Sequence, residues 1–172
     1  MFMLLLYILS FISYFVNVKG QTALAAATSA SINSTYELEV FNLVNNVRSK
    51  GAICGGIVKP AVLRLTWNQS LANAARGHSI DMANKNYFSH TSLDGRTFVD
   101  RVRAAGYYPY RTLCENIAAG YNTASAVMNG WMSSTGHCNN IMNPSFKEIG
   151  VGYAFNSLST YDYYWTQDFG AR

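Results

Sequence analysis

Apolar residues recur every three or four positions in four stretches of the chain, the spacing that buries one face of a helix. The first predicted helix follows Ser34 or Thr35 and ends at Gly51, because glycine commonly terminates helices. Its apolar positions are Leu38, Phe41, Val44 (or Leu43) and Val47. The second begins after Asn68, a residue type that caps helix N-termini. Its apolar face consists of Leu71, Ala74, Ala75, His78 and Met82.

Two further helices are predicted in the second half of the chain. One follows the sequence HTSLDGRT and ends at Gly106, with apolar positions Phe98, Val102 and Ala105. The other begins at Asn122 or Thr123 and ends near Gly136, with apolar positions Val127, Met128 and Trp131. Between the first two helices, AICGGIVKPAVLRLTW is predicted as a loop with a short extended piece over residues 62–67.

Near the C-terminus the pattern changes to alternation, which indicates strands. In EIGVGYAF, bulky residues alternate with Gly150, Gly152 and Ala154, so one face is nearly bare and a helix backbone can pack closely on it. YDYYWTQDFG alternates again after the polar turn NSLST, and the two segments predict an antiparallel hairpin. CENIAAG is compatible with a further short strand. Helices that precede strands favour an α+β fold over a doubly wound sheet.

Residues 1–18 carry no charge and are followed by small residues, a pattern typical of a secretory signal peptide. We expect cleavage after residue 20 or residue 25, a short linker over residues 26–35, and one domain over residues 36–170. An uncleaved N-terminal membrane anchor is the alternative, because the usual basic start of a signal peptide is missing. The predicted location is extracellular, and Asn33 and Asn68 both fit the glycosylation acceptor pattern of a eukaryotic secretory pathway.

The composition restricts the class of protein. Hydrophobic residues make up 49% of the chain and charged residues 13%, so a folded domain with a substantial core is expected. The net charge of +4 is scattered rather than gathered into a basic stripe, which argues against nucleic-acid binding. Three cysteines suit an exported protein with one disulfide and one leftover thiol. Spacing alone does not choose the pair, and no C-x-x-C metal motif is present.

The three histidines are the main candidates for chemistry. His78 lies on a predicted apolar helix face and is interpreted as a core residue bonded to a neighbour. His90 and His137 are both placed on loops, and Glu115 is the only acidic residue between Arg103 and Lys147. Two imidazoles and a carboxylate around one cleft could hold a divalent metal such as zinc, or form a polar cavity without metal.

Other catalytic chemistries find little support in the residue patterns. H-E-x-x-H is absent, and so is the G-x-S-x-G turn of a serine hydrolase. Ser133 and Ser134 are interpreted as helix-end residues. Cys138 follows His137 directly, but adjacent side chains usually point apart, and a disulfide is the simpler use of an exported cysteine.

Three longer segments resemble the CAP superfamily, the domain of cysteine-rich secretory proteins, venom antigens and group 1 pathogenesis-related proteins. The segments are LANAARGHSIDMANKNYFSHTSLDGRTFVDRVRAAGY, CENIAAGYNTASAVMNGWMSSTGHCNNIMNPSFKEIGVGYA and YYWTQDFG, and the resemblance covers about residues 36–170. It implies a three-layer α-β-α sandwich with a central antiparallel sheet. It also implies a cavity of two histidines and two glutamates, which holds zinc or another divalent ion in some members.

The family pattern assigns the cavity positions to residues of this chain. It puts His90, Glu115 and His137 in the cavity, whereas Ser134 stands where the second glutamate is usual. Losing a carboxylate weakens the case for a metal. The resemblance further implies a Cys54–Cys138 disulfide that leaves Cys114 free. It assigns structural roles to Asn116 and Gln167, which would bond the backbone of the cavity loops, and to Trp131, which would pack its helix on the sheet.

The resemblance implies a secreted, monomeric, non-enzymatic module. Its expected ligand is a small apolar molecule, such as a sterol or fatty acid, or an extracellular protein partner. The alternative is a metal-dependent hydrolase or protease, in which His90 and His137 hold the ion and Glu115 acts as ligand or base.

Overall fold

The computed structural model describes residues 35–172, of which Tyr36–Arg172 form one compact unit. The predicted signal peptide, most of the predicted linker and the glycosylation acceptor Asn33 lie outside the described residues. Within residues 35–172, no helix is both long enough and apolar enough to cross a bilayer.

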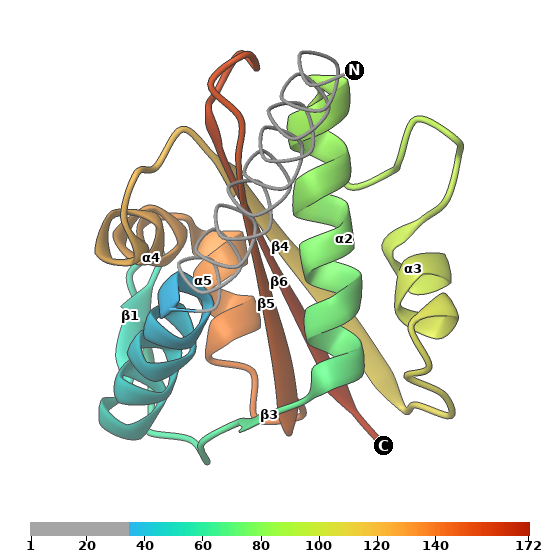
Figure 1. The fold of residues 1–172 in the computed structure, drawn as a ribbon. Coiled ribbons are helices and arrows are strands. Elements are labelled where there is room, and N and C mark those ends of the chain that lie inside the picture. The colour runs from blue at the N-terminus through green and yellow to red at the C-terminus, as the bar shows by residue number, and fades with distance from the viewer. Residues whose placement is uncertain (1–34) are drawn as a thin grey trace, which may run out of the picture. The chain divides into compact units, whose positions relative to one another are not determined.

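Short runs of helices and strands follow one another along the described chain (Figure 1). A helix over residues 35–50 comes first. It is followed by β1 (Ala52–Cys54), β2 (Ile57–Lys59), β3 (Thr66–Trp67), α2 (Gln69–Lys85), α3 (Phe98–Ala104), β4 (Thr112–Ala119), α4 (Ala124–Ser133), α5 (Thr135–Ile141), β5 (Glu148–Phe155) and β6 (Tyr163–Ala171).

The main sheet has four strands in the order β3-β5-β6-β4. The predicted C-terminal hairpin is confirmed: β5 and β6 pair antiparallel, with Ile149 opposite Phe169. β4 pairs antiparallel with the other side of β6, which places Glu115 opposite Asp168 and makes β4 an edge strand of the sheet. The short strand β3 pairs parallel with β5, so the expected antiparallel sheet has one parallel neighbour.

Helices cover both faces of this sheet, and the expected α-β-α sandwich is confirmed. α2 packs on the face that Gly150 and Gly152 leave bare, where an added Cβ would overlap the backbone of Ala72 or Ala75. On the other face, side chains of residues 35–50, α4 and α5 form the largest core cluster with Ile149, Val151, Tyr153, Trp165 and Phe169. In Figure 1 the β5–β6 hairpin runs between α2 and the α4/α5 pair.

Helix starts and stops follow the predicted local chemistry. The Asn68 side chain accepts hydrogen bonds from the Ser70 and Leu71 amides and so caps α2. It also donates to Glu148 through Nδ2, the atom that a glycan would occupy, and glycosylation of Asn68 stays a prediction. Gly106 has a φ of +88° after α3, as the predicted helix stop requires.

The buried face of the first helix differs from the prediction. Leu38 is 49% exposed, whereas Glu37 is 1% exposed. The Glu37 carboxylate is held by Arg76 of α2 and accepts a hydrogen bond from the Tyr153 amide. The buried face of this helix therefore includes the Glu37 carboxylate, paired with the partly exposed Arg76, in place of Leu38.

Two elements were missing from the sequence prediction. Residues 52–59 form a hairpin whose turn residues Gly55 and Gly56 both have positive φ, rather than a loop. Residues 135–141 form α5, so the prediction that His137 lies on a loop is wrong. The extended backbone of Ser134 separates α4 from α5. The predicted Cys54–Cys138 disulfide is confirmed, with a Cα–Cα distance of 5.5 Å, and joins the hairpin to α5.

Candidate functional site

Glu115 is the centre of a buried polar cluster at the edge strand β4. Its side chain is 1% exposed, and each carboxylate oxygen has a partner. Oε1 lies 2.8 Å from His90 Nδ1, and Oε2 accepts a hydrogen bond from Arg101 Nη2 at 2.6 Å. A carboxylate this deeply buried needs such partners because desolvation strongly disfavours an isolated charge.

Arg101 of α3 fixes the loop that carries His90, and the sequence prediction missed it. Its Nη1 donates to the carbonyl oxygens of His90 and Arg96 and to Ser92 Oγ, at 3.0 to 3.2 Å. A signal was present in the sequence: Arg101 stands three residues after Phe98 and four before Ala105, on the predicted apolar face. A charged residue in that position indicates a buried ion pair.

His90 presents one ring nitrogen for binding. Its side chain is 54% exposed although Nδ1 is engaged by Glu115. Nε2 is therefore the nitrogen left for a ligand, a proton or an ion. A carboxylate on Nδ1 is the partner that commonly fixes the ring orientation of metal-ligating and catalytic histidines.

His137 lies on α5, near enough to His90 for the charges of the two rings to interact. Burial lowers the pKa of His137, and the positive charge that His90 can carry lowers it further. The Asn116 side chain, next to Glu115 in sequence, donates to the His137 carbonyl oxygen at 3.4 Å. The structure thus bonds His90 directly to Glu115 and places His137 within electrostatic reach of His90.

The other predicted polar residues hold this region together. Asn116 bonds the α5 backbone, as the family pattern implies, but Gln167 bonds the Asn116 side chain instead of a loop backbone, with an Nδ2–Oε1 distance of 3.0 Å. Asn140 Nδ2 donates to Asn116 Oδ1 at 2.8 Å and ties α5 to β4. Ser134 precedes α5 and makes no side-chain capping bond.

The arrangement of these residues does not fit Glu115 as a metal ligand. Both of its oxygens are already bonded, one of them to a guanidinium group whose positive charge repels a cation. Across residues 35–172, no three His, Cys, Asp or Glu side chains form a group that could hold a metal ion. Two imidazole rings are the donors that remain, with Glu115 behind one of them as an orienting partner.

Two buried titratable residues complete the α2 side of the cluster. His78 is a core residue as predicted, with Nε2 2.9 Å from the Ser89 carbonyl oxygen, and burial lowers its pKa. Asp168, opposite Glu115 on β6, was not predicted as a site residue. Burial raises the pKa of Asp168 well above its usual range, and the negative charge of Glu115 raises it further. Asp168 therefore stays protonated more readily than an ordinary aspartate.

The free thiol does not contribute a nucleophile. Cys114 is half-buried on β4, and burial raises its pKa to about 11. The thiolate, which is the reactive form, is therefore scarce at neutral pH. Cys138, which follows His137, has no free thiol because it forms the disulfide with Cys54.

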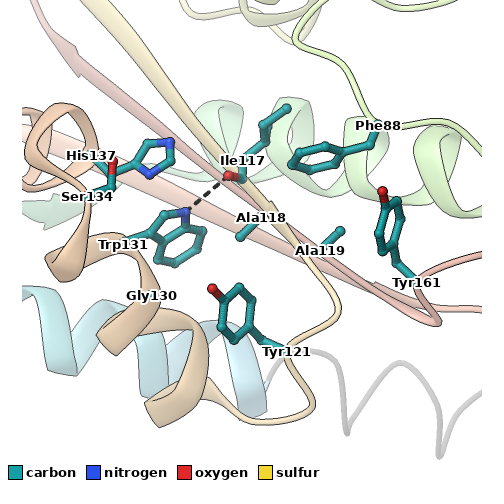
Figure 2. Close-up of a pocket in the computed structure, with 10 residues that line it drawn as sticks. All are labelled: Phe88, Ile117, Ala118, Ala119, Tyr121, Gly130, Trp131, Ser134, His137 and Tyr161. Atoms are coloured by element: carbon teal, nitrogen blue, oxygen red, sulfur yellow. Dashed lines mark hydrogen bonds between the residues drawn. The ribbon is translucent and has the colours of Figure 1, made fainter.

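A pocket of about 340 Å³ lies along the outer edge of β4, and we call it the β4 pocket. Figure 2 shows Phe88 and Tyr161 at one end and Trp131 and His137 at the other, with β4 residues between them. Its complete lining is Phe88, Ile117, Ala118, Ala119, Tyr121, Gly130, Trp131, Ser134, His137 and Tyr161.

The aromatic residues of the β4 pocket come from four separate parts of the chain. Trp131 is 1% exposed and packs α4 against β4, as predicted, with Nε1 3.3 Å from the Ile117 carbonyl oxygen. Phe88 and Tyr161 make an edge-on ring contact at 5.9 Å between centroids. No local sequence pattern links residues 88, 121, 131 and 161, so this pocket could not be predicted from the sequence.

Comparison with known proteins identifies the family. The model of the CAP family, described as the cysteine-rich secretory protein family, matches residues 41–169, and this chain belongs to that family. The chain is 38% identical over 151 residues to "Uncharacterized protein YkwD" of Bacillus subtilis, an alignment that covers 88% of this chain and 52% of that protein. It is 35% identical over 121 residues to "Uncharacterized membrane protein YlbC" of the same organism, with coverages of 70% and 32%.

Solved structures agree with this assignment. An extracellular protein containing an SCP domain from Bacillus anthracis is 33% identical with a TM-score of 0.68, and the match covers 82% of this chain and 42% of that one. A cysteine-rich secretory protein from Staphylococcus aureus shares the fold, with 19% identity, a TM-score of 0.57 and coverages of 81% and 40%. The chain spans about half or less of the length of these curated relatives.

Proposed function

We propose that this protein is an extracellular CAP-domain binding module whose ligand occupies the β4 pocket. The observation that carries the proposal is the pocket lining: four aromatic side chains and three apolar β4 residues face it, with Ser134 and His137 at one end. Mostly apolar concavities with a few converging polar groups are the usual form of a ligand site. The extracellular location is supported by the relative from Bacillus anthracis, which is described as extracellular.

The exposed rings explain why an apolar group would bind there. Phe88 and Tyr161 are 44% and 45% exposed, and Tyr121 is 37% exposed. Covering these rings removes apolar surface from water, which favours binding. A sterol, a fatty acid or an apolar part of a protein partner would each satisfy this requirement. The polar end at His137 and Ser134 would orient the ligand.

Equilibrium binding of radiolabelled sterol and palmitate tests the small-ligand form of the proposal. The double substitution Phe88→Ala/Tyr161→Ala removes two walls of the pocket and is expected to weaken binding roughly tenfold or more. The matched control is Phe155→Ala/Leu158→Ala, which removes residues that are 53% and 91% exposed and do not line the pocket. If neither lipid binds saturably, or if both double variants weaken binding equally, no lipid occupies this pocket.

A metal-dependent hydrolase or protease is the second candidate function. The contact between His90 Nδ1 and Glu115 supports it, because this pairing orients a histidine for ion binding or for accepting a proton. In such an enzyme, His90 and His137 would hold a divalent ion such as zinc. Metal analysis of the purified protein and peptidase assays with added divalent ions would detect it. Activity that is absent with every ion tried, or unchanged in His90→Gln, would eliminate this candidate.

A further inference from the structure

We infer that the β4 pocket takes an extended peptide segment, which adds as a strand to the outer edge of β4. This inference rests on the proposed function, because it names the chemical class of ligand for the same pocket. It depends on a feature that the pocket lining alone does not reveal, namely the direction in which the backbone groups of β4 point.

The register of the sheet fixes those directions. Gly120 donates its N–H to the Tyr163 carbonyl oxygen at 2.9 Å, and the same register pairs Ala118 with Trp165. Backbone groups of successive strand residues point to opposite edges. Even-numbered residues of β4 therefore bond β6, whereas Ile117 and Ala119 direct their N–H and C=O groups away from the sheet.

These outward groups are largely unpaired and lie in the pocket. Within residues 35–172, Ala119 has no hydrogen-bond partner for its outward N–H or C=O, and Ile117 has none for its N–H. The Ile117 carbonyl oxygen accepts only the 3.3 Å contact from Trp131 Nε1, and a carbonyl oxygen can accept two hydrogen bonds. All of these residues line the β4 pocket.

The unpaired backbone groups discriminate between ligand classes. A sterol or an acyl chain seated on β4 would cover the outward groups of the half-buried Ala119 without hydrogen bonds, which costs binding free energy, whereas Ile117 is only 4% exposed before any ligand binds. An extended peptide carries donors and acceptors at the same spacing along the strand and would satisfy them. Strand addition to an exposed sheet edge is an established mode of peptide binding, in which the main chain supplies affinity and the pockets beside it supply specificity.

The pocket walls define the side chains that such a peptide would carry. Phe88 and Tyr161 stand at one end of the edge, and Trp131 and Tyr121 stand toward the other (Figure 2). No Lys, Arg, Asp or Glu lines the pocket. Successive side chains of a strand point to opposite sides. The ligand is therefore an uncharged segment with apolar or aromatic side chains.

The test uses a capped hexapeptide pool with uncharged residues and an otherwise identical pool that is N-methylated at every backbone amide, so that neither edge of the extended peptide keeps a donor. N-methylation removes backbone donors but keeps the side chains. We expect the first pool to bind the whole protein saturably. In nuclear magnetic resonance spectra, the Ile117 and Ala119 amides should change chemical shift and exchange hydrogen more slowly. The N-methylated pool should bind roughly tenfold more weakly or worse.

A pair of protein variants provides an independent check. Ala119→Pro removes an outward N–H, and proline is tolerated on edge strands. Ala119→Val keeps that N–H and serves as its control. Binding of the peptide pool should weaken roughly tenfold in the first variant and little in the second. If Ala119→Pro does not fold, the affinities of the two peptide pools for the unaltered protein still test whether backbone hydrogen bonds hold the peptide.

The possible outcomes separate this inference from the proposed function. Equal affinity for the two peptide pools would overturn the strand-addition inference. Peptide-induced chemical-shift changes confined to residues away from β4 would overturn it too. Saturable binding of sterol or palmitate without any peptide binding would overturn it as well, while the pocket would remain a ligand site. If neither lipids nor peptides bind, the proposed function fails together with the inference.

Discussion

The two faces of the main sheet carry different kinds of side chain. The face under α2 carries Gly150 and Gly152, where the helix backbone lies almost directly on the strands. It also carries the buried carboxyl groups of Glu115 and Asp168. The opposite face carries large side chains such as Trp165, packed under α4 and α5.

Both faces combine apolar burial with polar bonds, but they position different parts of the site. On the α2 face the helix backbone lies close to the strands at Gly150 and Gly152, and the buried bonds of Glu115 to His90 and Arg101 hold His90 in place. The opposite face supplies apolar burial and carries the disulfide that anchors α5. The β4 pocket lies at the strand where the two faces meet, with Phe88 from the loop after α2 and Trp131 from α4.

The largest effect is expected when side-chain volume is changed at two neighbouring β5 residues, one on each face of the sheet. We expect Gly150→Ala to lower the free energy of unfolding by about 4 kcal/mol or more, because the new Cβ overlaps the backbone of Ala72. On the opposite face, Val151→Ala should cost about 2 kcal/mol through a small cavity. Urea denaturation measures both. A larger loss for Val151→Ala would contradict the picture of a rigid α2 face.

Removing Arg101 should have the next largest effect. Arg101→Leu leaves the buried Glu115 carboxylate without its guanidinium partner, and we expect a loss of about 3–5 kcal/mol. Arg96→Leu removes an exposed ion pair with Asp94 and should change stability by less than about 1 kcal/mol. The double variant Arg101→Leu/Glu115→Leu should recover part of the first loss. Equal effects of the two single arginine variants would show that the buried pair is not structurally important.

The disulfide of the opposite face should contribute a smaller amount. We expect Cys54→Ser/Cys138→Ser to lower the free energy of unfolding by about 2–4 kcal/mol, since the bridge closes a long loop of the unfolded chain. Cys114→Ser breaks no bridge and should cost less than about 1 kcal/mol. Thermal unfolding with and without reductant provides the measurement. Non-reducing peptide mapping that found Cys114 bridged would refute the assignment.

Asp168 should make stability depend on pH in a direction opposite to that of a salt-bridged carboxylate. Its pKa is raised in the folded protein, whereas the unfolded chain releases the proton near pH 4. The associated stability is therefore fully present below about pH 4 and is lost as the pH rises through the folded pKa. Asp168→Asn should flatten this decline in unfolding experiments from pH 4 to pH 8. An identical decline in the variant would mean that Asp168 is not its source.

The smallest expected effect concerns the two histidines near β4. The pKa of His137 should lie below its usual value, and His90→Gln should raise it, because a neighbouring positive charge is removed. Nuclear magnetic resonance titration of the ring protons measures this directly. Ser134→Ala removes no charge and should leave the pKa of His137 nearly unchanged. If His90→Gln has no influence, the two imidazoles are not electrostatically coupled.

Local patterns were sufficient where one neighbour decides the structure. The alternation of Gly150 and Gly152 with bulky residues predicted a hairpin with one bare face, and α2 lies on that face. The side chain of Asn68 predicted the start of α2. The family pattern supplied the Cys54–Cys138 pair, which spacing alone did not. In each of these cases the determining information is contained in a short segment or in a recognised motif.

Only the tertiary structure decided which distant groups meet. Glu37 of the first helix is buried and paired with the partly exposed Arg76 of α2, whereas Leu38 is exposed. The partnership of Arg101 with Glu115 and the aromatic walls of the β4 pocket also join segments far apart in sequence. Hydrophobic periodicity indicates which face of a helix or strand is buried. Whether a buried polar group is stable depends on the hydrogen-bond partner on the neighbouring element. That partner is determined by the packing of the whole domain.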